Sequence, residues 1–229
     1  MNKAVIYLSK MLSIIFSPFL STFWAFLFVW HHMFAQAQTL DISYKVFLFN
    51  NSYQLTTTYR NYLLAIVLIF TVIIPYASIY FFRRLNKWSG WQISHREHRH
   101  VPYIIAILSY AACLLLLTQT HTWMFFRSIV LASLACMILS FAINFRWKIS
   151  THMVGMGGLT GMLIACSIAL RFNPLFPLSI LFLLAGSVGT ARMTLRQHSL
   201  AQIGAGFLLG VIVTALIISF RGVLCPNFN

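Results

Sequence analysis

Residues 191–202, with the sequence ARMTLRQHSLAQ, form a short polar segment between two apolar runs at 178–188 and 203–220. Runs as apolar as these are typical of helices that cross a lipid bilayer. The polar segment is therefore expected at a membrane surface, where one spanning helix ends and the next begins.

Three side chains of this segment are suited to binding or attacking a phosphate: Arg192, Arg196 and His198. A guanidinium binds two phosphate oxygens at once, and an imidazole attacks phosphorus or donates a proton. If a helix begins near Ser199, His198 and Gln202 lie one turn apart on one face. The alternative is a solvated loop whose basic residues mark membrane orientation.

Composition places the whole chain in a membrane. Of its 229 residues, 60% are hydrophobic and only 8% are charged, with a mean hydropathy of +0.83. A soluble globular domain does not need this much apolar surface. Because no polar linker separates two parts, residues 1–229 are predicted to form a single membrane domain.

The scarcity of acids excludes several classes of enzyme and transporter. Asp41 and Glu97 are the only two carboxylate side chains in the sequence. Two-metal phosphatases and magnesium-dependent transferases need several carboxylates to hold their ions, and proton- or sodium-coupled transporters usually carry an acid within a span. A GxxxxGK[ST] phosphate loop is also missing from the sequence. We therefore expect no metal site and no cofactor.

The formal charge of +14 comes from cations in the short connections between apolar runs. At such positions the nearby anions are membrane lipids and phosphorylated lipids, so these are the expected partners and nucleic acid is not. The four cysteines are far apart in the sequence and no pair has metal-ligand spacing. They are predicted to be packing residues.

The apolar runs predict an all-α, polytopic membrane helix bundle with about six to seven spans. The expected spans are 11–30, 62–82, 102–118, 123–145, 153–170, 178–190 and 200–220. The first also fits a signal peptide, because Ala35-Gln36-Ala37 has the form of a cleavage site, but its apolar run is longer than usual and we expect a span. Pro75 predicts a kink in the second span, and residues 119–122 predict a tight hairpin.

Two GxxxG pairs, Gly157/Gly161 and Gly206/Gly210, predict close helix packing. The polar segments 83–101, 146–152 and 191–198 are separated by two crossings each, so all three are expected on one side of the membrane. On that side they gather cations and two histidines: Lys87, Arg96, Arg99, Lys148, His152, Arg192, Arg196 and His198. Such a cluster balances the charge of a transferring phosphoryl group without a metal.

These residues resemble motifs of the type 2 phosphatidic acid phosphatase superfamily, in its membrane lipid-phosphatase branch. The family's Ser-Arg-x5-His-x3-Asp motif is matched by Ala191-Arg192-x5-His198, with Gln202 in place of the acid. Its Pro-Ser-Gly-His motif is matched loosely by ISTH at 149–152. Its Lys-x6-Arg-Pro motif has its nearest counterpart in Arg99, which Pro102 follows, with Lys87 the nearest lysine upstream. The resemblance covers about residues 87–210.

The resemblance implies a metal-independent lipid phosphatase or diphosphatase with a phosphohistidine intermediate. His198 would attack phosphorus, and His152 would protonate the leaving lipid oxygen. The residues that would hold the phosphoryl oxygens are Arg192, Arg99, Arg96, Lys148 and Lys87. Gln202 would orient His198 through its carbonyl without bringing the family's negative charge, and Glu97 is another candidate for that role.

Two other functions remain open at this point. A degenerate relative would bind an anionic lipid without hydrolysis, and a transporter or flippase-like bundle would fit the number of spans. The resemblance implies a bacterial inner membrane. Lysines and arginines near the ends of the first two spans favour a cytoplasmic site by the positive-inside rule, whereas many bacterial members of the family have a periplasmic one.

Overall fold

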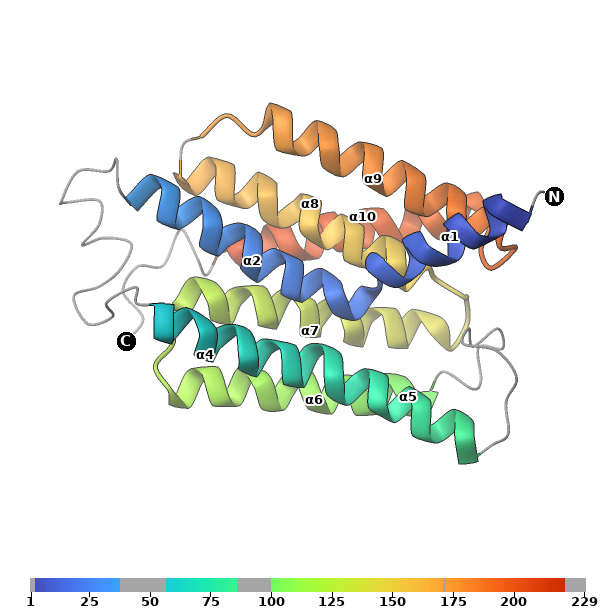
Figure 1. Ribbon diagram of the computed structural model, residues 1–229, viewed down its shortest axis with the longest axis horizontal. Coiled ribbons are helices and arrows are strands. Elements are labelled where there is room, and N and C mark those ends of the chain that lie inside the picture. The colour runs from blue at the N-terminus through green and yellow to red at the C-terminus, as the bar shows by residue number, and fades with distance from the viewer. Residues whose placement is uncertain (1–2, 38–56, 86–99, 171, 221–229) are drawn as a thin grey trace.

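The computed structural model describes residues 3–37, 57–85, 100–170 and 172–220 (Figure 1). The elements in this described part are all helices: α1 (Lys3–Ile15), α2 (Pro18–Ala37), α4 (Thr57–Val67), η1 (Leu68–Ile73), α5 (Ile74–Leu85), α6 (His100–Gln119), α7 (Met124–Asn144), α8 (Thr151–Leu170), α9 (Leu175–Thr194) and α10 (Leu200–Ile218). Six helices are long and apolar enough to cross a membrane, or up to seven if a bent pair counts as one span. The predicted all-α polytopic bundle is confirmed, and the chain is a multi-pass membrane protein.

The predicted first span at 11–30 falls on two helices, α1 and α2, whose axes differ by 59° across a short break. The break has a local cause, because Pro18 cannot donate a backbone hydrogen bond and is tolerated only in the first turn of a helix. Ser17 caps the new helix by accepting a hydrogen bond from the Leu20 amide at 3.4 Å.

The second span is longer than predicted and runs continuously over 58–85. Its irregularity takes the form of the π-helical turn η1, which ends two residues before Pro75. A proline at 75 cannot donate to the carbonyl of Thr71, four residues earlier. The Tyr110 hydroxyl of α6 donates to that carbonyl at 3.5 Å instead. A neighbouring helix thus satisfies the backbone group that the proline leaves, as a membrane requires.

Helices α8 and α10 pack backbone against backbone, as the two GxxxG pairs predict. Four of the glycines at this interface are the members of the GxxxG pairs, Gly157, Gly161, Gly206 and Gly210. A Cβ atom added at Gly157 would meet the carbonyl oxygen of Phe207, and one at Gly206 would lie 2.6 Å from the carbonyl oxygen of Ser150. The glycines therefore let the two helices approach more closely than any other residue would allow.

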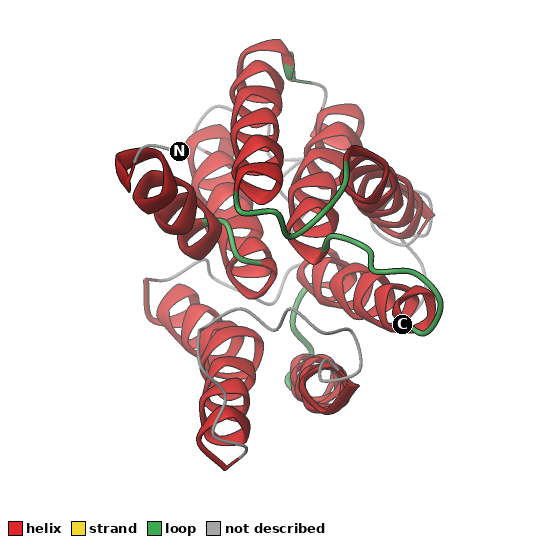
Figure 2. Ribbon diagram, turned by 90° about the vertical axis from the view of Figure 1, so that its right-hand side faces the viewer, coloured by secondary structure: helices red, strands yellow, loops and turns green. Residues whose placement is uncertain are grey.

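The ends of several helices meet at one end of the bundle, on the right of Figure 1 and facing the viewer in Figure 2. There the Ser150 amide before α8 donates to the carbonyl of Gln202 in α10 at 3.4 Å. The His100 ring at the start of α6 lies 4.9 Å from the Phe145 ring at the end of α7, between ring centroids. We call this region, formed by α1, the C-terminal ends of α7 and α9, and the N-terminal ends of α6, α8 and α10, the polar end. The predicted hairpin at 119–122 joins α6 to α7 at the opposite end.

Candidate functional site

The backbone of residues 191–202 is fixed by two successive capping motifs. At the end of α9 the Arg196 amide donates to the Met193 carbonyl at 2.8 Å, and the Gln197 amide donates to the Arg192 carbonyl at 3.1 Å. This is the Schellman pattern, which requires a left-handed residue, and Arg196 has φ 51°. Helix α10 then begins with a capping box at Ser199. The segment is therefore a compact helix-to-helix turn.

Arg192 belongs to the last turn of α9, because that helix extends to Thr194 and not only to the predicted residue 190. Its side chain is 3% exposed. Its Nη1 atom donates to the Ser13 hydroxyl of α1 at 3.4 Å. A cation at the C-terminal end of a helix is favoured by the helix dipole. Arg192 is thus a buried positive charge at the junction of α9 and α1.

His152 lies in the first turn of α8, half-buried against the same residue of α1. Its Nε2 atom is 3.1 Å from the Ser13 carbonyl oxygen. Because a carbonyl only accepts hydrogen bonds, Nε2 carries the proton in this contact. Ser13 therefore joins Arg192 through its hydroxyl and His152 through its carbonyl, which brings two of the predicted site residues to one point.

His198 precedes α10 and is 8% exposed. Its Nδ1 atom is 3.1 Å from Gln202 Oε1, which also accepts from the Ser199 amide at 3.2 Å. An amide oxygen only accepts hydrogen bonds. The imidazole Nδ1 atom therefore carries a hydrogen and donates it to Oε1, as the Ser199 amide also does. The lone pair of the neutral ring is then on Nε2. Gln202 thus fixes both the start of α10 and the tautomer of His198.

The two histidine-bearing segments are joined by backbone contact. The hydrogen bond from the Ser150 amide to the Gln202 carbonyl and the close approach of Gly206 to Ser150 hold the starts of α8 and α10 together. The Ser150 side chain is fully buried, and its hydroxyl has no hydrogen-bond partner among the described residues. His152 and His198 are therefore each one turn or less from the same interhelix contact.

The other predicted site residues are placed as follows. Lys148 is half-buried in the connection between α7 and α8, close in sequence to His152. Lys87, Arg96 and Arg99 lie outside the described residues, as does Glu97, so their roles stay predictions.

Ser13 is the contact residue that the sequence did not single out. It belongs to a row of serines spaced by four, Ser9, Ser13 and Ser17, which are 5%, 6% and 3% exposed. The outward face of α1 is apolar instead: Val5, Tyr7, Leu8, Met11, Ile14 and Ile15 are all exposed. In a membrane protein this inversion is expected, because lipid accepts the apolar face and the polar face turns inward. In the sequence, the spacing of these serines by four residues indicates a polar face on this helix.

The side chains gathered here carry groups that can contact an oxyanion. Arg192 supplies a buried cation, His152 supplies an N–H donor, and His198 supplies a ring nitrogen with a lone pair. Within the ranges that the structure describes, no three His, Cys, Asp or Glu side chains lie close enough together to hold a metal ion. A group with several acceptor oxygens, such as a phosphate, matches the donors on Arg192 and His152.

Comparison of the chain with known protein families, with curated proteins and with solved structures gives no match.

Proposed function

We propose that the chain is an integral membrane phosphatase or diphosphatase that removes phosphate from a phosphorylated lipid. Candidate substrates are phosphatidic acid, phosphatidylglycerophosphate, undecaprenyl diphosphate and lipid A phosphates. The observation that carries the proposal is the meeting of Arg192 and His152 at Ser13, beside the segment that orients His198. A phosphate oxygen that took the place of the Ser13 groups would satisfy both donors.

In the proposed reaction, His198 Nε2 attacks phosphorus while Gln202 holds Nδ1–H. The bond from phosphorus to the lipid oxygen breaks, and His152 gives that oxygen its proton. Water then attacks the phosphohistidine and gives a proton to His152, which returns to its starting form. The bond from phosphorus to His198 breaks, inorganic phosphate leaves, and His198 is again a free imidazole. Arg192 neutralises the phosphoryl oxygens throughout, aided by Lys148 and by the cations Lys87, Arg96 and Arg99. Because Gln202 is neutral, it orients His198 without stabilising the imidazolium form as an acid would.

Phosphate release from the four lipid classes, measured in detergent with EDTA present, tests this function. The wild-type protein should release phosphate from at least one class, and His198→Ala should reduce the rate at least about a hundredfold. His121→Ala is the matched control, because His121 is exposed in the hairpin at the opposite end of the bundle. Release by folded His198→Ala at the wild-type rate, or no release by the wild type from any class, would overturn the proposal.

A second function is favoured by one observation. The neutral amide of Gln202 does not stabilise a charged His198 as an acid would, and the Ser13 hydroxyl already contacts Arg192, so the alternative function is lipid binding without hydrolysis. A lipid-binding relative would retain lipid phosphate without releasing it, and Arg192→Met would abolish that retention. Movement of lipid across liposomes without hydrolysis would instead indicate a transporter.

The proposed location is a bacterial inner membrane with the polar end in the cytoplasm. Lys3 and Lys10 are exposed on α1, and Arg83 and Arg84 occupy the last turn of α5, which the positive-inside rule places in the cytoplasm. An impermeant maleimide on intact cells tests this, with the native cysteines replaced. A cysteine at Asn173, exposed at the far end, should be labelled and one at Arg196 should not. The reverse pattern would put the site in the periplasm.

A further inference from the structure

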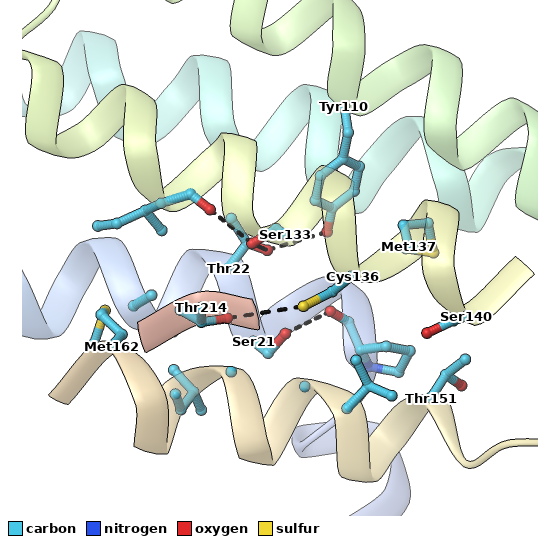
Figure 3. A pocket seen from close by; sticks show the side chains of 17 residues that line it. Ser21, Thr22, Tyr110, Ser133, Cys136, Met137, Ser140, Thr151, Met162 and Thr214 are labelled. Carbon is cyan, nitrogen blue, oxygen red and sulfur yellow. Dashed lines mark hydrogen bonds between the residues drawn. The ribbon is translucent and has the colours of Figure 1, made fainter. Parts of the chain in front are cut away.

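A partly open cavity of about 50 Å³ lies between α2, α6, α7, α8 and α10 (Figure 3). Its walls carry hydroxyl groups from all five helices. The residues that supply them include Thr22, Tyr110, Ser133, Ser140, Thr151 and Thr214. None of the cavity's lining residues is charged. Hydroxyl groups gathered from five helices are unusual in a membrane interior, where each polar group needs a partner.

Three of these hydroxyls contact one another, and a fourth contacts a cysteine thiol. Thr22 Oγ1 lies 3.0 Å from Ser133 Oγ and 3.2 Å from the Tyr110 hydroxyl. Thr214 Oγ1 lies 3.8 Å from Cys136 Sγ. The first group of contacts joins α2, α6 and α7, and the second is a separate pair between α7 and α10.

Ser140 is different. It is 1% exposed, and its hydroxyl has no hydrogen-bond partner among the residues that the structure describes. Other serines of α7 donate to the carbonyl four residues earlier, as Ser128 does to Met124 at 2.9 Å and Ser133 to Ile129 at 2.9 Å. Figure 3 shows the Ser140 hydroxyl turned toward the cavity. Ser140 therefore lacks the intrahelical bond that the other two serines make, and its hydroxyl faces the cavity.

Size and chemistry limit what that group is. A cavity of about 50 Å³ holds on the order of two or three water molecules, and a buried water needs two to four polar partners. An uncharged lining gives no counterion for a phosphate or a metal ion. Water fits the volume, and its donors and acceptors match those of hydroxyl groups.

We propose that this cavity is an internal water site, in which a small water cluster is hydrogen-bonded to Ser140 and to neighbouring hydroxyls. Ser140 lies in the last turn of α7, and Thr151 is the first residue of α8, so this part of the cavity lies toward the polar end. The proposed water is therefore held beside Thr151, which directly precedes His152 in the sequence. The site stands on the cavity and on Ser140, independently of the proposed phosphatase activity.

Thermal unfolding of Ser140→Ala in detergent tests the proposal through the sign of its effect. If Ser140 binds water, its removal breaks a buried hydrogen bond, and the Tm should fall by about 2–4 °C relative to wild type. If the cavity is dry, removal of an unsatisfied hydroxyl should raise the Tm. Ser128→Ala is the matched control, because Ser128 is equally buried on α7 and its hydroxyl is satisfied within the helix.

A thiol at the same position gives a second measurement. Ser140→Cys and Ser128→Cys are compared in a protein whose four native cysteines are replaced by alanine, with methyl methanethiosulfonate as a small neutral reagent. A thiol reacts as its thiolate, which forms in contact with water and not in an apolar core. Ser140→Cys should react at least about tenfold faster. Rates within twofold of each other, or a Tm of Ser140→Ala that is no lower than that of the wild type, would overturn the water site.

Discussion

Helix α8 packs against α10 with its backbone, whereas α1 packs against the same polar end with serine hydroxyls and a carbonyl. In the first interface, glycines such as Gly157 and Gly206 bring main chains into direct contact. In the second, Ser13 contacts Arg192 and His152, and the outer face of α1 is exposed and apolar. The first interface joins the starts of α8 and α10, and the second joins α1 to the start of α8 and the end of α9.

The difference separates a fixed part of the site from a replaceable part. Backbone packing at glycines fixes the distance between the helices, because any added side-chain atom must push them apart. A hydrogen bond from Arg192 to a serine is exchangeable, since a phosphate oxygen accepts the same bond more strongly. The α8–α10 interface is therefore expected to set the spacing of His152 and His198, and α1 to be the part that a bound anion competes with.

The largest effect is expected at the glycine interface. Gly157→Ala places a Cβ atom against the Phe207 carbonyl, and the separation of α8 from α10 should cost about 2–3 kcal/mol of unfolding free energy. Unfolding in detergent measures this cost. Gly204→Ala is the control, because a Cβ at Gly204 meets nothing within 4 Å and alanine favours a helix. Equal stability of the two variants would mean that the backbones do not need to touch.

An intermediate effect is expected from Ser13→Ala. The substitution removes a hydrogen bond to a buried guanidinium and should cost about 1–2 kcal/mol of unfolding free energy. Inorganic phosphate should recover most of that loss, because it supplies the missing acceptor to Arg192. Ser187→Ala is the control on α9, where the hydroxyl is exposed and bonded to the Leu183 carbonyl. Phosphate that stabilises Ser13→Ala no more than the control would show that α1 does not cover an anion site.

The smallest effect on stability is expected from Gln202→Glu. Glutamate keeps an acceptor for His198 Nδ1 and for the Ser199 amide, and its charge in the first turn of α10 should add about 0.3–1 kcal/mol of unfolding free energy. The same charge favours protonated His198 and should shift the pH profile of phosphate release. Gln202→Leu loses the capping box and should cost about 1 kcal/mol. An unchanged pH profile for the glutamate variant would show that the side chain at residue 202 does not influence His198 during phosphate release.

Much of the architecture follows from the sequence alone. The lengths of the apolar runs are set by the thickness of a bilayer, so the spans from residue 58 onward could be located before the structure was known. The GxxxG pairs depend only on the lack of a side chain, and they located the α8–α10 contact. The one-turn spacing of His198 and Gln202 is also a local property, because Ser199 and Gln202 form a capping box within one helix end.

The tertiary structure decided the rest of the candidate site. Pro18 signals a break in the first apolar run, but the direction of α1 before the break depends on which groups its serines contact. The burial of Arg192 depends on α9 reaching Thr194 and on α1 covering it, which no local pattern states. Ser13 and Arg192 are 179 residues apart in the chain. Local sequence determines where helices begin and end and which of their faces are apolar. The pairing of distant polar groups is decided only when the helices pack, because every buried polar group then needs a partner.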